Sequence, residues 1–330
     1  MINKKYKNIK TGVIGTGSMG QNHARILSEI SDFVGIADVN EKTLKLMSDK
    51  FKVKGYVDYK ELLNEVDAVS IAVPTIYHHE IALNAIDSNV HLLVEKPLAM
   101  NLEEASEIVK KAKEKDVVLA VGHIERHNPV IQYAKEKIDS GEWGDLISLS
   151  SRRVSNYPAR ISDVGVLYDL ASHDIDICLY LSSSSVKSLY LTGGKMVSKH
   201  EDHINLVMNH KSGLISVVEA NWLTPMKVRN LSITTSKCFV VLDYFHQSIN
   251  IYKSNFPDVN QSNLYKSGVD FDNETINLER QEPLLLELSD FLSSINNNHF
   301  PLVTGEDGAD VISIVESGIK SLEDTNIIKL

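Results

Sequence analysis

Two groups of polar residues in this 330-residue chain have the types and spacing of proton-transfer chemistry. In the first group, Asp169 and His173 are four residues apart among apolar residues, so on a helix both side chains project from one face. A carboxylate beside a histidine orients the ring and tunes its basicity near neutral pH. The pair therefore either serves the structure or moves a proton, and both interpretations stay open.

The second group is Glu95-Lys96-Pro97, at the end of the apolar run from His91 to Glu95. An ammonium group is strongly hydrated, so a lysine at the end of a buried strand must be paired or face a cleft. Pro97 restricts Lys96 to an extended backbone and permits a cis bond between the two residues. A salt bridge at the strand edge and a catalytic lysine both agree with this pattern.

A glycine-rich turn, Gly15-Thr16-Gly17-Ser18-Met19-Gly20, follows the apolar strand Ile9 to Ile14 and opens a helix expected to run to about Ile30. In this context Gly15 permits a tight turn, Gly17 lets the backbone approach a pyrophosphate, and Gly20 lets helix and strand pack closely. Amide groups and the dipole at a helix start attract phosphate. We expect all six residues of the turn to bind a dinucleotide.

Further cofactor contacts are expected where neighbouring strands end. Asp38, after the strand Phe33 to Ala37, is placed to accept hydrogen bonds from the adenosine ribose and to repel a 2′-phosphate. No Arg or Lys follows directly, which favours NAD over NADP; the alternative is an aspartate that merely caps the next helix. Thr75 and His78 follow the strand Ala68 to Val73 and are predicted on the nicotinamide side, although a surface position suits His78 equally well.

We predict no metal site. Two groups combine histidine with carboxylates: His173 with Asp169 or Asp176, and His123 with Glu125 and His127. Neither has the zincin motif or a supporting pair of cysteines. Cys178 and Cys238 have no metal-pair spacing and are expected to be buried apolar thiols.

Alternating strands and helices must position these residues. Within residues 1–123, several strands are apolar throughout, which is typical of parallel strands buried on both faces. The clearest helix, Asn101 to Asp116, has acidic residues in its first turns and lysines in its last, which complements the helix dipole. The pattern predicts an α/β fold with an N-terminal Rossmann domain, a doubly wound parallel sheet. The strands are expected at Ile9 to Ile14, Phe33 to Ala37, Ala68 to Val73, His91 to Glu95 and Val117 to Gly122.

After Pro129 the pattern becomes that of an α+β domain with an antiparallel sheet, which we assign to residues 124–330. Residues 203–209 and 214–222 are predicted to form a hairpin. Residues 254–277 are predicted to be an irregular surface loop. Other helices are expected at 130–140, within 163–181, at 282–296 and at 307–323, and a strand at 146–155; the last helix can pack back on the first domain.

Composition narrows the classes of partner. The chain has 43% hydrophobic and 24% charged residues, as an ordinary globular protein has, and a formal net charge of −10. That charge argues against nucleic acid and anionic membranes as partners. No apolar run approaches the ~18–20 residues of a membrane span, and the first residues lack a secretory signal, so we expect a cytoplasmic location. An anionic ligand must then be held by local groups.

In combination, these motifs resemble the Gfo/Idh/MocA (glucose-fructose oxidoreductase) family over nearly the whole chain, including the segment from Pro301 to Gly308. The resemblance implies an open-faced second domain with a large, mostly antiparallel sheet, and a homodimer or homotetramer. It implies oxidation of a sugar ring hydroxyl with NAD, the substrate lying between the domains. It also implies that Lys96 and His173 flank the reacting hydroxyl with Asp169 nearby, and that Glu95 and Lys96 lie on the cofactor side.

Two stretches, Val121 to Pro129 and Arg160 to Asp174, look like the branch that contains UDP-N-acetylglucosamine 3-dehydrogenases. This resemblance implies a nucleotide-sugar substrate. Position 127, where that branch more often carries phenylalanine, is a histidine here. The implied substrate residues are Arg126, Asn128, Arg160, Lys96 and His173. Arg152 and Arg153 offer further positive charge for a diphosphate, and ordinary surface arginines on a strand explain them equally well.

Two other functions remain open. A free polyol or sugar dehydrogenase, such as an inositol 2-dehydrogenase, needs no diphosphate site, and a non-catalytic NAD-binding sensor uses the same fold. The identity of the base is also open. We favour His173 as the base with Lys96 stabilising the developing alkoxide, and the reverse assignment is the alternative.

Overall fold

The computed structural model describes residues 5–157, 164–254 and 271–330, and the chain divides into two compact units. The first unit comprises residues 1–127 and 282–316, and the second comprises residues 128–281 and 317–330. The expected domains, 1–123 and 124–330, are two successive stretches of chain. The compact units are not, because the chain leaves the first unit after His127 and re-enters it at Glu282.

The described residues of the first unit form a six-stranded parallel sheet in the order β3-β2-β1-β4-β5-β6, which confirms the doubly wound prediction. The strands are β1 (Tyr6–Ile14), β2 (Ser31–Ala37), β3 (Lys54–Tyr56), β4 (Ala68–Ile71), β5 (His91–Glu95) and β6 (Leu119–Gly122). The sequence analysis missed β3, because three residues are too few to show a hydrophobic pattern.

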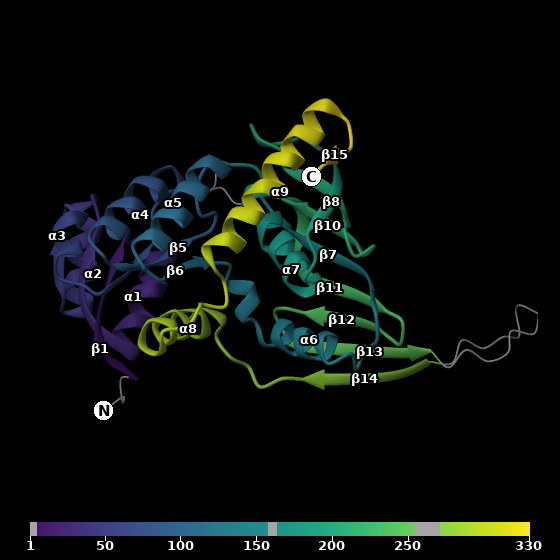
Figure 1. The fold of residues 1–330 in the computed structure, drawn as a ribbon, viewed down its shortest axis with the longest axis horizontal. Helices are drawn as coiled ribbons and strands as arrows, with labels where there is room; N and C mark the ends of the chain where they lie inside the picture. The colour runs from purple at the N-terminus through teal and green to yellow at the C-terminus, as the bar shows by residue number, and fades with distance from the viewer. Residues whose placement is uncertain (1–4, 158–163, 255–270) are drawn as a thin grey trace, which may run out of the picture. The chain divides into compact units, whose positions relative to one another are not determined.

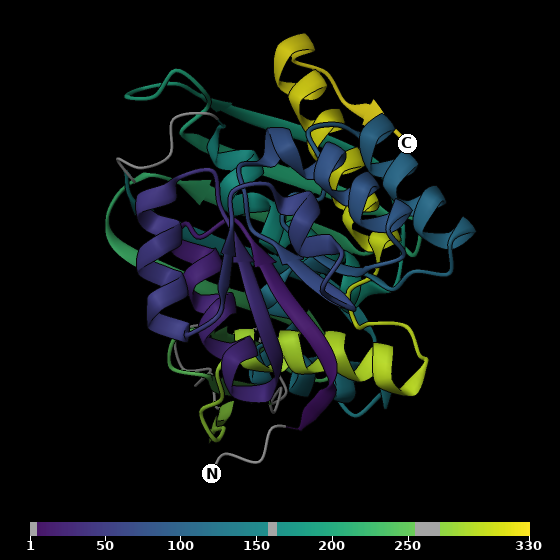
Figure 2. The ribbon, with the colours of Figure 1, turned by 90° about the vertical axis from the view of Figure 1, so that its left-hand side faces the viewer.

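Helices cover both faces of this sheet. α1 (Ser18–Ile30), α2 (Glu41–Phe51) and α8 (Pro283–Asn297) pack on one face. α3 (Tyr59–Leu63), α4 (His78–Asp87) and α5 (Leu102–Glu114) pack on the other. Although α8 is distant in sequence, it lies beside β1 (Figure 2), and the hydroxyl of Tyr6 donates to the carbonyl of Ser289 (2.9 Å). Burial of apolar side chains on both faces thus fixes the carboxyl ends of β1, β2, β4 and β5 relative to one another.

In the second unit, the described strands form a nine-stranded sheet in the order β14-β13-β12-β11-β7-β10-β9-β8-β15 (Figure 1). Its strands are β7 (Leu146–Asn156), β8 (Val186–Gly194), β9 (His203–His210), β10 (Ile215–Asn221), β11 (Leu223–Thr235), β12 (Phe239–Asp243), β13 (Ser248–Ser254), β14 (Phe271–Asn277) and β15 (Ile328–Lys329). Neighbours are antiparallel except β7 and β10. The hairpin prediction is confirmed by β9 and β10.

The prediction of an irregular loop over 254–277 was wrong for residues 271–277, which form the edge strand β14 against β13. The segment is polar and mostly exposed, so it lacks the alternation of a half-buried strand. Residues 255–270, the middle of the same prediction, lie outside the described residues.

The helices of the second unit pack on one face of this sheet (Figure 1). They are α6 (Pro129–Asp139), α7 (Ser172–Ser182) and the end of α9 (Gly305–Asp324), whose first part belongs to the first unit. Cys178 and Cys238 are both buried, as predicted. None of the helices in the described part of the chain is long and apolar enough to cross a membrane.

A buried ion pair ties α7 to β7. Nε of Arg153 lies 2.5 Å from Oδ2 of Asp174, both side chains are 1% exposed, and the guanidinium also lies over the ring of Tyr244. Burial removes both charges from water, so each depends on the other. Arg153, considered above as a positive group for a diphosphate, is thereby part of the core beneath the Asp169–His173 helix.

We expect Asp174→Ala to lower the free energy of unfolding by about 3–5 kcal/mol, because it leaves the guanidinium of Arg153 buried without this carboxylate. The matched control is Arg152→Ala. Arg152 precedes Arg153 on β7, but its pair with Glu219 is partly exposed, so we expect a loss within about 1 kcal/mol. Chemical denaturation measures both. Equal losses in the two variants would contradict a special role for the buried pair.

Candidate active site

The glycine turn after β1 admits no side chain at two positions. Gly15 has φ +89°, and a Cβ there would lie 2.6 Å from the carbonyl oxygen of Ala72. A Cβ on Gly20 would lie 1.9 Å from the carbonyl oxygen of Gly15, so α1 packs directly on the turn. At the exposed Gly17, a Cβ would meet no described atom within 4 Å, which leaves the backbone open to a ligand. The three predicted glycine roles agree with this geometry.

The start of α1 fits an anionic group. Gly17 is the N-cap and supplies no side-chain acceptor, and the first turn, which holds Ser18 and Met19, has no acidic residue in the described structure. By contrast, the first turn of α5 contains Glu103 and Glu104. The unused amide groups and the helix dipole at α1 therefore suit a pyrophosphate.

Asp38 is fixed beside this turn. Its Oδ2 accepts hydrogen bonds from the backbone N (2.7 Å) and Oγ1 (2.5 Å) of Thr16, and its Oδ1 accepts one from the backbone N of Asn40 (2.8 Å). The N-cap of α2 is Asn40, whose side chain accepts from Thr43. The alternative that Asp38 merely caps the next helix is therefore wrong, and its half-buried carboxylate lies at the end of β2, where the ribose contact was predicted.

His78, at the first position of α4, is buried rather than on the surface. Its Nδ1 lies 2.8 Å from the carbonyl oxygen of Pro97, and its Nε2 lies 3.0 Å from that of Val73. Burial lowers the pKa of His78, although both carbonyls act in the opposite direction. The ring thus connects the segments that follow β4 and β5. Thr75 is half-buried in a short 3₁₀ turn before it, and cofactor contact by either residue stays a prediction.

Lys96 directly follows β5, is half-buried, and is joined to Pro97 by a cis bond. The preceding Glu95 is buried, and its Oε1 lies 2.9 Å from Nε2 of His23. On the other side of the ring, Nδ1 of His23 lies 2.7 Å from Oγ of Ser70 on β4. Sequence reasoning missed His23. The available signal was a histidine on the buried face of α1, three residues after Gly20.

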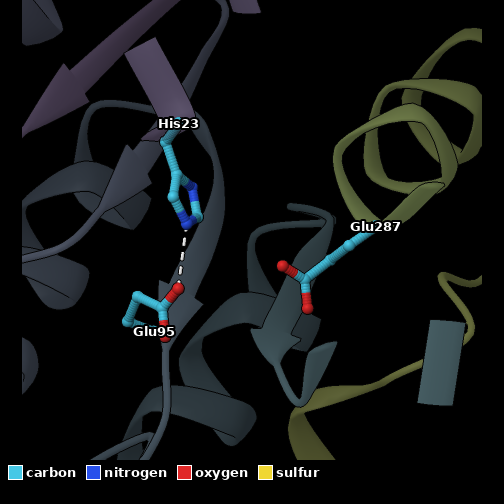
Figure 3. A group of neighbouring side chains, drawn as sticks. All are labelled: His23, Glu95 and Glu287. Carbon is cyan, nitrogen blue, oxygen red and sulfur yellow. Dashed lines mark hydrogen bonds and ion pairs between the residues drawn. The ribbon is translucent and has the colours of Figure 1, made fainter. Parts of the chain in front are cut away.

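Glu287 on α8 completes a buried cluster with His23 and Glu95, which we call the α1–β5–α8 cluster (Figure 3). The carboxylate of Glu287 points toward the other two side chains, and the ligand atoms lie within 4.8 Å of one another. Histidine and glutamate are residue types that bind zinc. However, Nε2 of His23 and Oε1 of Glu95 lie 2.9 Å apart, which is a hydrogen-bond distance, whereas two ligand atoms around tetrahedral zinc would lie about 3.3 Å apart. We therefore treat His23 and Glu95 as a hydrogen-bonded pair with Glu287 beside it.

In the second unit, Asp169 and His173 are both half-buried and lie on one continuous helix. Its first part, Leu167–Ala171, is a π-helical turn, in which the backbone N of Ser172 donates to the carbonyl oxygen of Leu167. The predicted helix is confirmed, but its π-helical start was not predicted. Such turns occur frequently at functional sites.

Glu201, from the loop before β9, holds the start of this helix. Its Oε1 accepts from the backbone N of Leu167 (3.2 Å), and its carbonyl oxygen accepts from that of Val166 (2.9 Å). A Cβ on Gly165 would lie 2.0 Å from the Glu201 carboxylate, so a larger residue there would have to displace this side chain from the backbone N of Leu167. The glycine in the Asp163-Val164-Gly165 stretch thus has a packing reason.

Three residues predicted to contact the substrate are placed as follows. Nη2 of the buried Arg126 lies 3.0 Å from Oδ1 of Asp307 within the first unit. The side chain of Asn128 caps α6 and donates to the carbonyl oxygen of Tyr244 (3.2 Å) within the second. Arg160 lies outside the described residues. These contacts are internal to the units, and the substrate roles stay predictions.

His127, where the related branch more often has phenylalanine, is also buried. Burial and the charge of Arg126 lower its pKa to about 4. At neutral pH the ring is therefore uncharged, so the substitution keeps an uncharged aromatic ring at this position.

Comparisons with known proteins add independent findings. A sequence model described as "Oxidoreductase family, NAD-binding Rossmann fold" matches residues 9–123, and one described as "GFO/IDH/MocA C-terminal domain" matches residues 131–241. The UDP-N-acetylglucosamine 3-dehydrogenase of Acidithiobacillus ferrooxidans is 29% identical over 288 residues, which cover 87% of this chain and 88% of that protein. The myo-inositol 2-dehydrogenase of Thermotoga maritima is 27% identical over 340 residues, 98% of both chains.

The solved structures agree. The Acidithiobacillus enzyme superposes with a TM-score of 0.87 at 27% identity, covering 96% of this chain and 98% of that one. A levoglucosan dehydrogenase solved with NADH has the same TM-score at 19% identity, covering 97% and 98%, which supports the fold alone.

We expect Asp38→Ala to raise the dissociation constant for NAD roughly tenfold, because hydrogen bonds to the ribose are lost. The preference for NAD over NADP should also become smaller, because the variant lacks the negative charge that repels a 2′-phosphate. Asp38→Asn removes the charge but keeps one acceptor oxygen, which can still serve Thr16. The control is Asp58→Ala, since Asp58 also follows a strand but caps α3. Calorimetric titration with both cofactors measures the constants, and an unchanged NADP/NAD ratio in both Asp38 variants would refute the assignment.

Proposed function

Since this chain belongs to the Gfo/Idh/MocA oxidoreductase family, we propose that it oxidises UDP-N-acetylglucosamine to UDP-3-keto-N-acetylglucosamine with NAD. The family match and the named relatives make the chain a sugar or polyol dehydrogenase. The observation that carries the finer proposal is its likeness to the Acidithiobacillus enzyme in both sequence and fold, over at least 87% of this chain.

The geometry of the first unit supports NAD as the cofactor. The open backbone at Gly17 and the start of α1 suit the pyrophosphate, and Asp38 suits the ribose. When bound, NAD supplies the acceptor for the hydride that leaves the sugar carbon. The remaining tasks, orienting the hydroxyl and removing its proton, fall to side chains of the protein.

We assign the removal of the hydroxyl proton to His173. Its half-buried ring follows the π-helical turn that carries Asp169 four residues earlier, and we assign to Asp169 the orientation of the ring. Lys96 would donate to the same hydroxyl oxygen and stabilise the alkoxide as it forms. The reverse assignment, with Lys96 as the base, uses the same residues.

The second candidate function is oxidation of a free polyol such as myo-inositol. It is favoured by the likeness to the Thermotoga enzyme, which covers 98% of both chains. It requires no site for a diphosphate, and the internal contacts of Arg126 and Arg153 are equally compatible with it.

A substrate panel tests the proposal. The purified protein is incubated with NAD and, separately, UDP-N-acetylglucosamine, other UDP-sugars, myo-inositol and free sugars. We expect NADH absorbance and a product that has lost two hydrogens with UDP-N-acetylglucosamine, and mass detection also covers a cofactor that copurifies. Faster oxidation of myo-inositol would support the second candidate. NAD binding without oxidation of any compound would indicate the non-catalytic sensor.

We expect Lys96→Met and His173→Asn each to lower kcat by about 10²–10⁴-fold, because each removes a group that acts on the reacting hydroxyl. In the variant that retains the base, kcat should still depend on pH through the titration of that base. In the other variant this dependence should be lost, so the two pH–rate profiles should differ. Controls are Lys110→Met and His246→Asn, since both side chains are more than 70% exposed. Near-normal turnover in both test variants would rule out this scheme.

A further inference from the structure

Lys96 stands between two residues that buried histidines hold in place. On its N-terminal side, Oε1 of Glu95 lies 2.9 Å from Nε2 of His23, and Nδ1 of His23 lies 2.7 Å from Oγ of Ser70. The other carboxylate oxygen of Glu95, Oε2, accepts from the backbone N of Lys96 (3.2 Å). A continuous set of hydrogen bonds therefore runs from β4 through α1 to the backbone of Lys96.

On the C-terminal side, the carbonyl oxygen of Pro97 lies 2.8 Å from Nδ1 of His78. The other ring nitrogen of His78 lies 3.0 Å from the carbonyl oxygen of Val73, just beyond β4. Both histidines are at most 1% exposed. A neutral imidazole carries a single N–H, so His78 donates to one of these two carbonyls and packs against the other. Both buried rings therefore hold the backbone beside Lys96 close to the end of β4.

The His23 contact also sets a charge beside Lys96. Burial acts to raise the pKa of Glu95, but the hydrogen bond and charge of His23, followed by the charges of Lys96 and His78, outweigh it, so the pKa is lowered. Glu287 faces the same pair from α8. Glu95 is therefore held as an anion next in sequence to Lys96.

We propose that His23, acting through Glu95, and His78, acting through Pro97, are positioning residues that fix the backbone and charge environment of Lys96 for the reaction. The inference rests on the proposed function in one respect, namely that Lys96 acts on the substrate hydroxyl. Neither histidine needs to contact substrate or cofactor. The lysine side chain is long and flexible, so a fixed starting point and a fixed counter-charge narrow the positions that its ammonium occupies.

Pairs of variants separate positioning from simple loss of stability. His23→Leu fills the site but removes the donor to Glu95, whereas His23→Gln places an amide N–H near the former Nε2. His78→Leu and His78→Asn form the corresponding pair, because the asparagine nitrogen lies near the former Nδ1. The matched control is His91→Leu. His91 lies at the opposite end of β5, and its Nδ1 accepts from the backbone N of Val118 (3.0 Å).

The substrate in this assay is the sugar that the wild-type protein oxidises in the substrate panel. We expect His23→Leu and His78→Leu to lower kcat about 10–100-fold while KM stays within about twofold, since a small misplacement of a reacting group affects the transition state most. His23→Gln and His78→Asn should recover most of the loss. His91→Leu should keep the wild-type kcat per folded molecule, with folding monitored by circular dichroism and NAD binding. Equal losses of kcat in all three leucine variants would overturn the proposal.

A second readout needs no turnover. Competitive labelling of amines with acetic anhydride at one fixed pH, read by mass spectrometry, gives the reactivity of the Lys96 amine relative to the other lysines. Removing the anion beside Lys96 should raise its relative labelling in His23→Leu and Glu95→Gln, and leave it unchanged in His91→Leu. Unchanged labelling of Lys96 in both test variants overturns the proposal. If no sugar is oxidised, the proposed function fails, and the labelling still decides whether His23 controls Lys96.

Discussion

Burial of a carboxylate at the end of β5 is the constraint on which the first unit depends. Taking the Glu95 charge out of water costs several kcal/mol unless a partner replaces the hydration, and His23 supplies that partner. His23 belongs to α1, whose first turn also forms the expected pyrophosphate site. The helix whose start is the proposed pyrophosphate site therefore also holds the residue beside Lys96, so displacing α1 would disturb both at once.

The sequence predicted this region unevenly, for physical reasons. The glycine turn was predictable because two of its glycines, Gly15 and Gly20, answer local steric demands that the structure shows. The doubly wound parallel sheet follows from repeated strand–helix units. The His23–Glu95 contact was not predictable, because 72 residues separate its partners in the chain and only folding brings them together. In the same way, nothing local in Leu167–Ala171 distinguishes a π-helical turn from an ordinary one.

The stretch from Val121 to Pro129 shows how a motif can carry structural rather than chemical information. Its Arg126 pairs with Asp307, which lies in another segment that carries the family resemblance, from Pro301 to Gly308. Asn128 caps a helix, and His127 is buried and uncharged at neutral pH. The two segments thus contact each other within the fold through this ion pair. A resemblance carried by such residues identifies the family securely, whereas it discriminates weakly between a nucleotide sugar and a free polyol.

An acidic protein that binds a dinucleotide needs a local field opposed to its net charge of −10. The helices around the sheet differ in this respect: α2, α4 and α5 have acidic residues in their first turns, whereas the first turn of α1 has none among its described residues. A carboxylate there would satisfy the free amide groups and compete with phosphate. Gly17, which offers neither a charge nor an acceptor from its side chain, leaves both the dipole and the amides to the ligand. The positive field at the start of α1 therefore depends on the lack of acidic side chains among the described residues of this turn as much as on its glycines.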